Sequence, residues 1–256
     1  AVCEAGSAMN NPSKIVIFGH GDIVETSLVR YFLGRGYLNV ISSTALQIPL
    51  LDSLRMKAFF EEARPEYVVL TSVRSGGIGA NQSFPAEFIY ENLQAQNNVI
   101  HLSHIHGVKK LLFLAASCVY PKDCFQPMKE DYFMTGPMEK TSEPYSMAKA
   151  AGIIMCQAYR KQYGFPAIVA VPATAYGPGP ADDMEQAHVI GAMVGKFCRA
   201  VRAGDKTIQF WGTGRPRREF IYAEDLADAC LSLLENYDGE DMLNIGTGED
   251  VTILEV

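Results

Sequence analysis

Tyr145 and Lys149 lie four residues apart in the run 143–149, and their types and spacing are suited to proton-transfer chemistry. Four residues make just over one helical turn, so a phenol and an ammonium at this spacing project side by side from one helix face. A neighbouring ammonium stabilises phenolate, which would lower the tyrosine pKa from about 10 toward neutrality. The pair therefore indicates an enzyme in which a phenol exchanges a proton with a substrate oxygen during hydride transfer. An isolated Tyr-x-x-x-Lys match is more often an ordinary helical pair, so the surrounding sequence must show whether this pair is catalytic.

The elements that would position this pair alternate along the first half of the chain. Short apolar runs predict strands at residues 15–18, 40–42, 67–71, 111–115 and 168–171. Amphipathic segments predict helices at residues 23–33, 53–63, 88–106 and 144–163. This alternation is typical of an α/β fold with a doubly wound parallel sheet, of the Rossmann-like type. The helix that carries Tyr145 directly precedes the fifth strand.

Beyond Pro172 the chain becomes richer in Pro, Gly and Asp, which indicates a second, smaller lobe. We expect helices at residues 188–203 and 223–235, and strands at 208–211 and 243–245. The predicted organisation is a flexible tail over residues 1–12, a dinucleotide-binding-type domain over 13–178, and a substrate-binding lobe over 179–256 interleaved with the last strands of the sheet. After Asp250 and Thr252 a further helix is expected to begin, with the fold continuing past Val256.

Composition limits the classes of partner. The 256 residues are 48% hydrophobic and carry a formal charge of -7, which argues against a nucleic-acid or anionic-membrane partner. No apolar run approaches the roughly 20 residues of a membrane helix, and residues 1–11 lack a signal-peptide pattern. The six cysteines are scattered, without a Cys-x-x-Cys pair, so we expect a cytoplasmic protein without a metal site.

Several segments, in their order and approximate spacing, resemble the extended short-chain dehydrogenases and, within them, the GDP-L-fucose synthase family. They are residues 76–78, 80–81, 88–92, 110–114, 117–121, 188–190, 211–214 and 218–220. Each segment alone is weak, but together they span nearly the whole chain from residue 15 onward. The resemblance implies an enzyme that binds NADPH, epimerises a nucleotide-linked 4-keto-6-deoxy sugar beside its ketone, then reduces that ketone. It also implies a homodimer.

The same resemblance assigns roles to single residues. Tyr145 would be the acid, and Lys149 would tune it and hold the cofactor ribose. Cys118 and His188 would be the acid and base of epimerisation, although each alone would more often be a structural residue. Near the substrate nucleotide the resemblance places Lys196, Trp211 and Arg218. The cofactor contacts would come from Gly19, His20, Gly21, Ile23, Val24, Leu114, Ala115, Ala116, Lys149, Pro172, Thr174 and Ala175.

The sequence departs from the family pattern at the dinucleotide loop. Asp22 and Glu25 replace the second and third glycines of Gly-x-x-Gly-x-x-Gly, whose glycines permit a tight turn and close approach of the pyrophosphate. A carboxylate about 5 Å from a phosphate would cost on the order of 3 kcal/mol at an effective dielectric of 20. Asp22 could instead cap the following helix. Ala116 stands where the family has a catalytic Ser or Thr, so Ser117 would have to substitute.

Two hypotheses remain open from the sequence. The first is an NADP-dependent epimerase and reductase acting on a nucleotide sugar. The second is a relative that has lost dinucleotide binding, and that acts as a cofactor-independent epimerase or as a binding or regulatory subunit. The second is motivated by the clustering of altered residues on cofactor contacts, whereas the proton-transfer residues persist.

Overall fold

The computed structural model describes residues 9–179, 189–210 and 212–256, and its main sheet consists of six parallel strands in the order β2-β1-β3-β4-β5-β8. The strands are β1 (Ile15–Phe18), β2 (Val40–Ser42), β3 (Tyr67–Leu70), β4 (Lys110–Leu114), β5 (Ala167–Pro172) and β8 (Leu243–Ile245). Every residue of β1, β3 and β4 is buried, as expected for strands covered on both faces. The predicted doubly wound α/β fold is confirmed.

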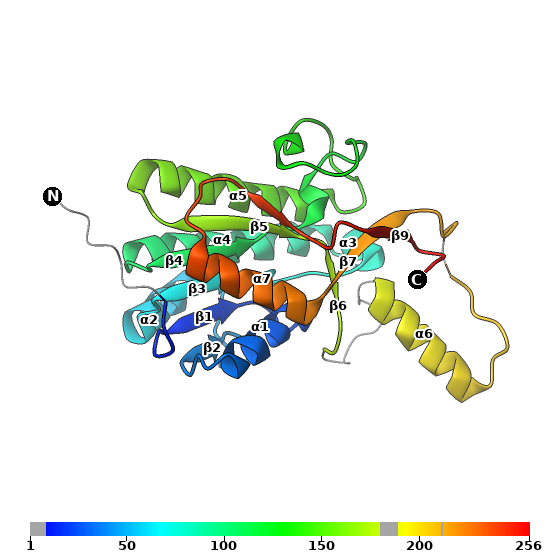
Figure 1. Ribbon diagram of the computed structural model, residues 1–256, viewed down its shortest axis with the longest axis horizontal. Helices are drawn as coiled ribbons and strands as arrows, with labels where there is room; N and C mark the ends of the chain where they lie inside the picture. Colours follow the sequence, from blue (N-terminus) through cyan, green and yellow to red (C-terminus); the bar gives the residue numbers. More distant parts are fainter. Residues whose placement is uncertain (1–8, 180–188, 211) are drawn as a thin grey trace.

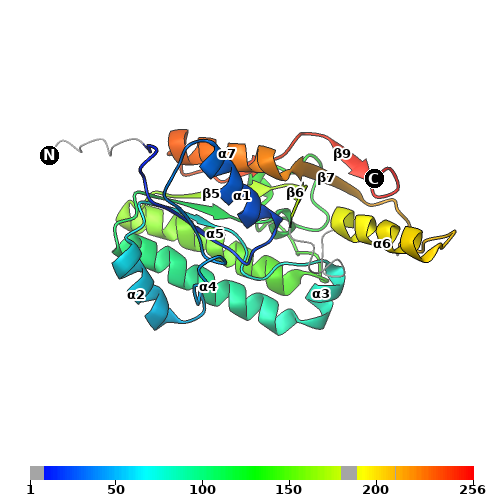
Figure 2. The same ribbon diagram turned by 90° about the horizontal axis from the view of Figure 1, so that it is seen from below.

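Helices cover both faces of this sheet (Figure 1, Figure 2). One face is covered by α1 (Ile23–Gly34) and α7 (Ala223–Asn236), which pack against each other. The other is covered by α2 (Ser53–Ala63), α4 (Pro85–Ile105) and α5 (Glu143–Tyr163). Two hydrophobic clusters separated by the sheet form the core. Across the described ranges, no helix is long and apolar enough to cross a membrane.

A second sheet joins β6 (Thr174–Tyr176), β7 (Arg217–Tyr222) and β9 (Asp250–Thr252) in the order β6-β7-β9. β6 and β7 are parallel, whereas β7 and β9 are antiparallel. Beyond the carboxyl ends of the main strands, α6 (Val189–Ala203) lies apart from the helical layers in both views (Figure 1, Figure 2). The short helix α3 (Ile78–Ser83) precedes α4.

This second part of the chain corrects two expectations. Residues 208–210 form no strand, and Trp211 lies outside the described residues. After Asp250 and Thr252, where a helix was expected to begin, residues 253–255 form a turn, and residues 250–252 form β9. The cause is long-range pairing, because the backbone of β9 bonds to β7, and such pairing overrides a local capping pattern.

The parallel arrangement brings the carboxyl ends of the main strands to one edge. β1 lies between β2 and β3, so the order of the strands reverses direction between β1 and β3. In open α/β sheets ligands bind at such a switch point. The loops after β1 and β3, the turn η1 (Ser117–Val119) after β4, and the start of α5 can all contribute residues there.

Candidate active site

The loop after β1 turns sharply into α1. A Cβ atom on Gly19 would lie 2.5 Å from Oγ1 of Thr71, and Gly21 has a φ of +81°, so both positions require glycine. Asp22 is the N-cap of α1, and its Oδ1 accepts a hydrogen bond from the backbone N–H of Glu25 at 2.9 Å. The capping role considered from the sequence is confirmed, and the first-turn N–H groups of α1 face the switch point.

Glu25 is buried beneath this loop, with 1% of its surface exposed. Its carboxylate accepts hydrogen bonds from the N–H of Gly21 (2.6 Å), the hydroxyl of Ser42 (2.7 Å), and both the N–H (3.2 Å) and the hydroxyl (2.6 Å) of Thr44. These four bonds engage all the lone-pair sites of a carboxylate. The expectation that Glu25 faces a cofactor phosphate is therefore wrong, because its charge is held behind the loop against the end of β2.

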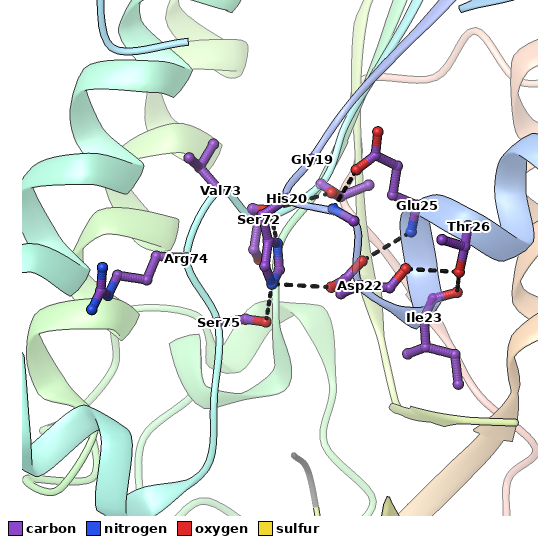
Figure 3. A network of polar contacts seen from close by, with 12 residues as sticks. Gly19, His20, Asp22, Ile23, Glu25, Thr26, Ser72, Val73, Arg74 and Ser75 are labelled. Carbon is purple, nitrogen blue, oxygen red and sulfur yellow. Dashed lines mark hydrogen bonds and ion pairs between the residues drawn. The ribbon is translucent and has the colours of Figure 1, made fainter. Parts of the chain in front are cut away.

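His20 bridges the loops after β1 and β3 (Figure 3). Its Nδ1 donates to the carbonyl oxygen of Ser72 at 2.6 Å, since a carbonyl can only accept. Its Nε2 lies 3.1 Å from Oγ of Ser75 and 3.8 Å from Oδ2 of Asp22. The imidazole thus fixes residues 72–75 relative to the start of α1.

Lys149 extends from α5 to the ends of two strands. Its Nζ donates to the carbonyl oxygens of Thr71 (3.0 Å) and Leu114 (2.7 Å), and it lies 4.8 Å from the ring centroid of Phe113. The side chain is 1% exposed, and burial lowers the pKa of Lys149 to about 7. Two of its three N–H donors are engaged by backbone, so the third is suited to a sugar hydroxyl.

Tyr145 lies one turn before Lys149 on α5, as the spacing predicted. Its phenol oxygen lies 2.8 Å from Oγ of Ser72, and its ring meets Phe88 edge-on at 6.0 Å. Burial raises the pKa of Tyr145, and the nearby Cys118 raises it further. The expected lowering by Lys149 is not found; the group that lowers the pKa of Tyr145 is the hydroxyl of Ser72, and burial outweighs it. At neutral pH the phenol is protonated and able to donate.

Ala115 and Ala116 lead from β4 into η1, which carries Ser117 and Cys118. Ser117 is exposed, whereas Cys118 is half-buried and lies beside Ser146 of α5, which lowers the pKa of its thiol. Burial raises the pKa of Cys118, so it is a thiol at neutral pH. The structure therefore brings Cys118 beside the helix turn that bears the Tyr-Lys pair.

The expected nucleotide-binding cations lie on α6 and β7. Lys196 lies on α6, and its Nζ is 3.4 Å from the carbonyl oxygen of Gln209 and 5.2 Å from the ring centroid of Phe210. Arg218 lies on β7, is exposed, and donates from Nη1 to the carbonyl oxygen of Arg217. These contacts are made within the lobe and do not join the two cations to the Tyr-Lys pair.

The remaining predicted positions divide into two groups. Pro172 ends β5, and Thr174 and Ala175 lie half-buried in β6, near the carboxyl edge of the main sheet. His188 and Trp211, assigned to epimerisation and to nucleotide binding, lie outside the described residues.

The described residues fit a dinucleotide. The first-turn N–H groups of α1, among them those of Ile23 and Val24, suit a pyrophosphate, because a helix N-terminus carries partial positive charge. Lys149 suits ribose hydroxyls. The carboxylate of Asp22 stays at this loop, and the imidazole of His20 lies beside it. Within the same described ranges, no group of His, Cys, Asp and Glu side chains is arranged to hold a metal.

Sequence reasoning assigned no site role to Thr71 or Ser72, although both contact the Tyr-Lys pair. The available signal was the pair of hydroxyl residues just after β3, together with the loss of a hydroxyl at Ala116. Spacing alone could not relate residues 72 and 145, because only the folded sheet and helix bring them together.

The chain is similar to known proteins over nearly its whole length. A model of the NAD dependent epimerase/dehydratase family matches residues 15–246. The chain is 43% identical over 253 residues to GDP-L-fucose synthase 1 of Arabidopsis thaliana, and the alignment covers 99% of this chain and 78% of that protein. It is 37% identical over 252 residues to GDP-L-fucose synthase of Escherichia coli strain K12, covering 95% and 78%.

Solved structures show the same similarity. A GDP-mannoheptose C4 reductase from Campylobacter jejuni with NADP bound is 37% identical, with a TM-score of 0.86 over 96% of this chain and 82% of that one. A GDP-D-glycero-L-gluco-heptose synthase from the same organism, solved in the presence of NADPH, is 34% identical, with a TM-score of 0.86 over 96% and 84%.

Proposed function

Because the chain belongs to the NAD dependent epimerase/dehydratase family, we propose that it is an NADP-dependent epimerase and reductase of a GDP-linked 4-keto-6-deoxy sugar, similar to GDP-L-fucose synthase. One observation carries the proposal: Tyr145, Lys149 and Cys118 meet at the carboxyl ends of β3 and β4. The GDP-sugar reductase with NADP bound supports the choice of cofactor and of nucleotide.

In the proposed reduction, the first turn of α1 would hold the pyrophosphate of NADPH, and Lys149, anchored to the carbonyls of Thr71 and Leu114, would hold its ribose. The cofactor, when bound, would supply the hydride for the ketone carbon. Tyr145 gives its phenolic proton to the ketone oxygen, because its raised pKa keeps it protonated at neutral pH. The ammonium of Lys149, one turn away, favours the phenolate that remains.

In the proposed epimerisation, a base removes a proton from the carbon next to the ketone and an acid returns one to the opposite face. Cys118 is the acid, because burial keeps its sulfur protonated. His188 is proposed as its partner on sequence resemblance alone. Ser117, exposed at the start of η1, faces solvent and is proposed as a substrate contact beside Cys118.

The lobe formed by residues 179–256 is the proposed substrate-binding part. Lys196 and Arg218, with Trp211, would hold the nucleotide diphosphate, and a guanidinium can bind phosphate oxygens bidentately. We also propose a cytoplasmic location, supported by the free thiols of Cys118, Cys124, Cys156, Cys198 and Cys230.

A homodimer is proposed from the outer surface of α4 and α5. Residues at helical spacing on this surface include four exposed apolar side chains: Tyr90, Ile105, Met147 and Ile154. The other positions of the same two stripes are Gln94, Asn97, His101, Ala151 and Ala158. Since the stripes contain no Asp, Glu, Lys or Arg, two copies can meet there without repulsion between like charges.

The test is to mix the purified protein with NADPH and GDP-4-keto-6-deoxymannose and to follow the loss of nicotinamide absorbance. Tyr145→Phe should abolish reduction while solvent deuterium still enters the sugar. Cys118→Ala should abolish deuterium incorporation. Absence of NADPH binding at millimolar concentration would contradict the proposal and favour a relative that has lost its cofactor.

A further inference from the structure

The phenol of Tyr145 is hydrogen-bonded to a serine from a different strand than the sequence suggested. Ser72 lies two residues after β3, and its Oγ is 2.8 Å from the phenol oxygen. The expected hydroxyl, that of Ser117 after β4, is exposed, and its neighbour Ala116 has only a methyl group. Among the described residues, the hydrogen bond of the phenol is made with Ser72.

The backbone around Ser72 is held firmly in place. Its carbonyl oxygen accepts from Nδ1 of His20, while the preceding residue, Thr71, donates from Oγ1 to the carbonyl oxygen of Phe18 at 3.1 Å. The carbonyl oxygen of Thr71 also accepts from Lys149. Consecutive residues after β3 therefore bind the phenol and the ammonium of the same pair, so β3 and α5 fix its geometry together (Figure 3 shows Ser72 beside His20).

Ser72 differs from the other groups near the phenol in its effect on the pKa of Tyr145. Asp22 on the loop after β1 and Cys118 after β4 both raise the pKa of Tyr145, as burial does. α4 contributes only the uncharged ring of Phe88, and Lys149 is turned to backbone carbonyls. The hydrogen bond from Ser72 acts in the opposite direction and lowers the pKa of Tyr145. A hydroxyl that donates to phenolate favours the charged form.

We propose that Ser72 is the positioning residue of Tyr145: its hydroxyl fixes the phenol toward the reacting ketone and donates to the phenolate once the proton has left. This rests on the proposed reductase function. The proton passes from the phenol oxygen of Tyr145 to the ketone oxygen, and Ser72 keeps its own proton and only turns it toward Tyr145. The hydroxyl lost at Ala116 is thus supplied from the neighbouring strand.

The first measurement does not depend on activity. Protein labelled with ¹³C at the tyrosine Cζ is examined by NMR, and the resonance of Tyr145 is identified by its loss in Tyr145→Phe. Ser72→Ala should shift this resonance, whereas Ser72→Thr, which keeps the hydroxyl, should leave it close to the wild-type position. Ser103→Ala is the matched control, since Ser103 is buried in α4 and its hydroxyl has no hydrogen-bond partner among the described residues.

The second measurement is the pH dependence of kcat for ketone reduction. Ser72→Ala should lower kcat roughly tenfold or more, with the KM for the sugar nucleotide nearly unchanged, because the phenolate is less well stabilised. The alkaline limb, where activity falls as Tyr145 loses its proton, should move to higher pH. Ser72→Thr should restore both.

The proposal is overturned if Ser72→Ala keeps the wild-type resonance and pH profile, or if Ser117→Ala moves the Tyr145 resonance and Ser72→Ala does not. A wild-type protein that fails to reduce the sugar would instead contradict the proposed function. In that case the Cζ resonance still reports whether Ser72 holds the phenol.

Discussion

Lys149 is a buried cation that should make stability depend on pH. Its folded-state pKa of about 7 is below its ordinary 10.5, so between these values the unfolded chain binds a proton that the folded chain does not. The free energy of unfolding should therefore rise with pH from about 7 to about 10, by up to about 1.4 kcal/mol per pH unit. Urea unfolding over this range measures the slope.

The matched variant is Lys149→Met, which keeps the length and loses the charge. The pKa values of Cys118 and Tyr145 are raised by folding, so these groups make the free energy of unfolding fall with pH in the same range. Because both proteins contain them, the difference between the two slopes reports Lys149 alone. The free energy of unfolding of Lys149→Met should not show the rise that Lys149 causes in the wild type. Equal slopes in both proteins would show that Lys149 stays protonated in the fold.

At this scale the sequence was partly sufficient. The spacing of Tyr145 and Lys149 correctly placed both on one helix face, and the resemblance to a known family directed attention to Cys118. Ser72 and the burial of Glu25 were not predictable, because both depend on contacts between strands and helices distant in sequence. The sign of the Tyr145 shift also required knowledge of its burial.

At the scale of elements, α5 packs closely on α4 and β4 at Gly152. A Cβ there would overlap the ring of Phe113 and lie 2.9 Å from Oε1 of Gln96, whose amide donates to the carbonyl oxygen of Ala148. Gly152→Ala should therefore destabilise the protein by about 1–3 kcal/mol in urea unfolding. Because Phe113 also faces Lys149, activity should fall as well.

The control for this substitution is Gly34→Ala, at the end of α1. A Cβ at Gly34 would meet no atom within 4 Å, and alanine favours the helix by up to about 1 kcal/mol. This variant should be neutral or more stable. If both alanines had the same effect, close packing at Gly152 would not be the cause.

Glu25 joins two elements, because its carboxylate on α1 binds Ser42 and Thr44 at the end of β2. Glu25→Gln keeps the shape of the side chain but replaces one carboxylate oxygen with an NH₂ group. This group can only donate, and it would face the N–H and hydroxyl groups that donate to the carboxylate. We expect a loss of about 2–3 kcal/mol in the free energy of unfolding. Glu87→Gln, at an exposed position of α4, should change it by less than about 0.5 kcal/mol. If Glu25→Gln had the same unfolding midpoint as the wild type, the buried carboxylate would not stabilise the fold as we expect.

The central strands were predictable because they are continuous apolar runs buried on both faces, as in β1, β3 and β4. The second sheet was not, because β6, β7 and β9 are short and gain their hydrogen bonds from partners 31 to 46 residues away, as in the pairing of Arg217 with Thr252. Local patterns carry little information about such pairing.

At the scale of the whole molecule, the layers leave α4 and α5 as the outer cover of one face (Figure 2). On this cover Tyr90 is 61% exposed, Ile105 57%, Met147 48% and Ile154 45%, at spacings that place them along the two helix surfaces. These four exposed apolar side chains are the observation on which the proposed interface rests. A second copy related by a two-fold axis would bury the surface on both chains at once.

Ile154→Asp tests that arrangement, because a two-fold axis would bring the new charge into the interface twice. Burying an unpaired carboxylate is costly, so the dimer dissociation constant should rise by at least about 100-fold, as measured by sedimentation velocity over a concentration series. Leu38→Asp is the control, since Leu38 is 78% exposed and precedes β2, away from α4 and α5. A wild-type monomer would contradict the proposed dimer, and a variant that dimerises as well as the wild type would place the interface elsewhere. If the variant is monomeric and still reduces its substrate, each chain contains a complete site, as the contacts of Tyr145 and Lys149 within one chain lead us to expect.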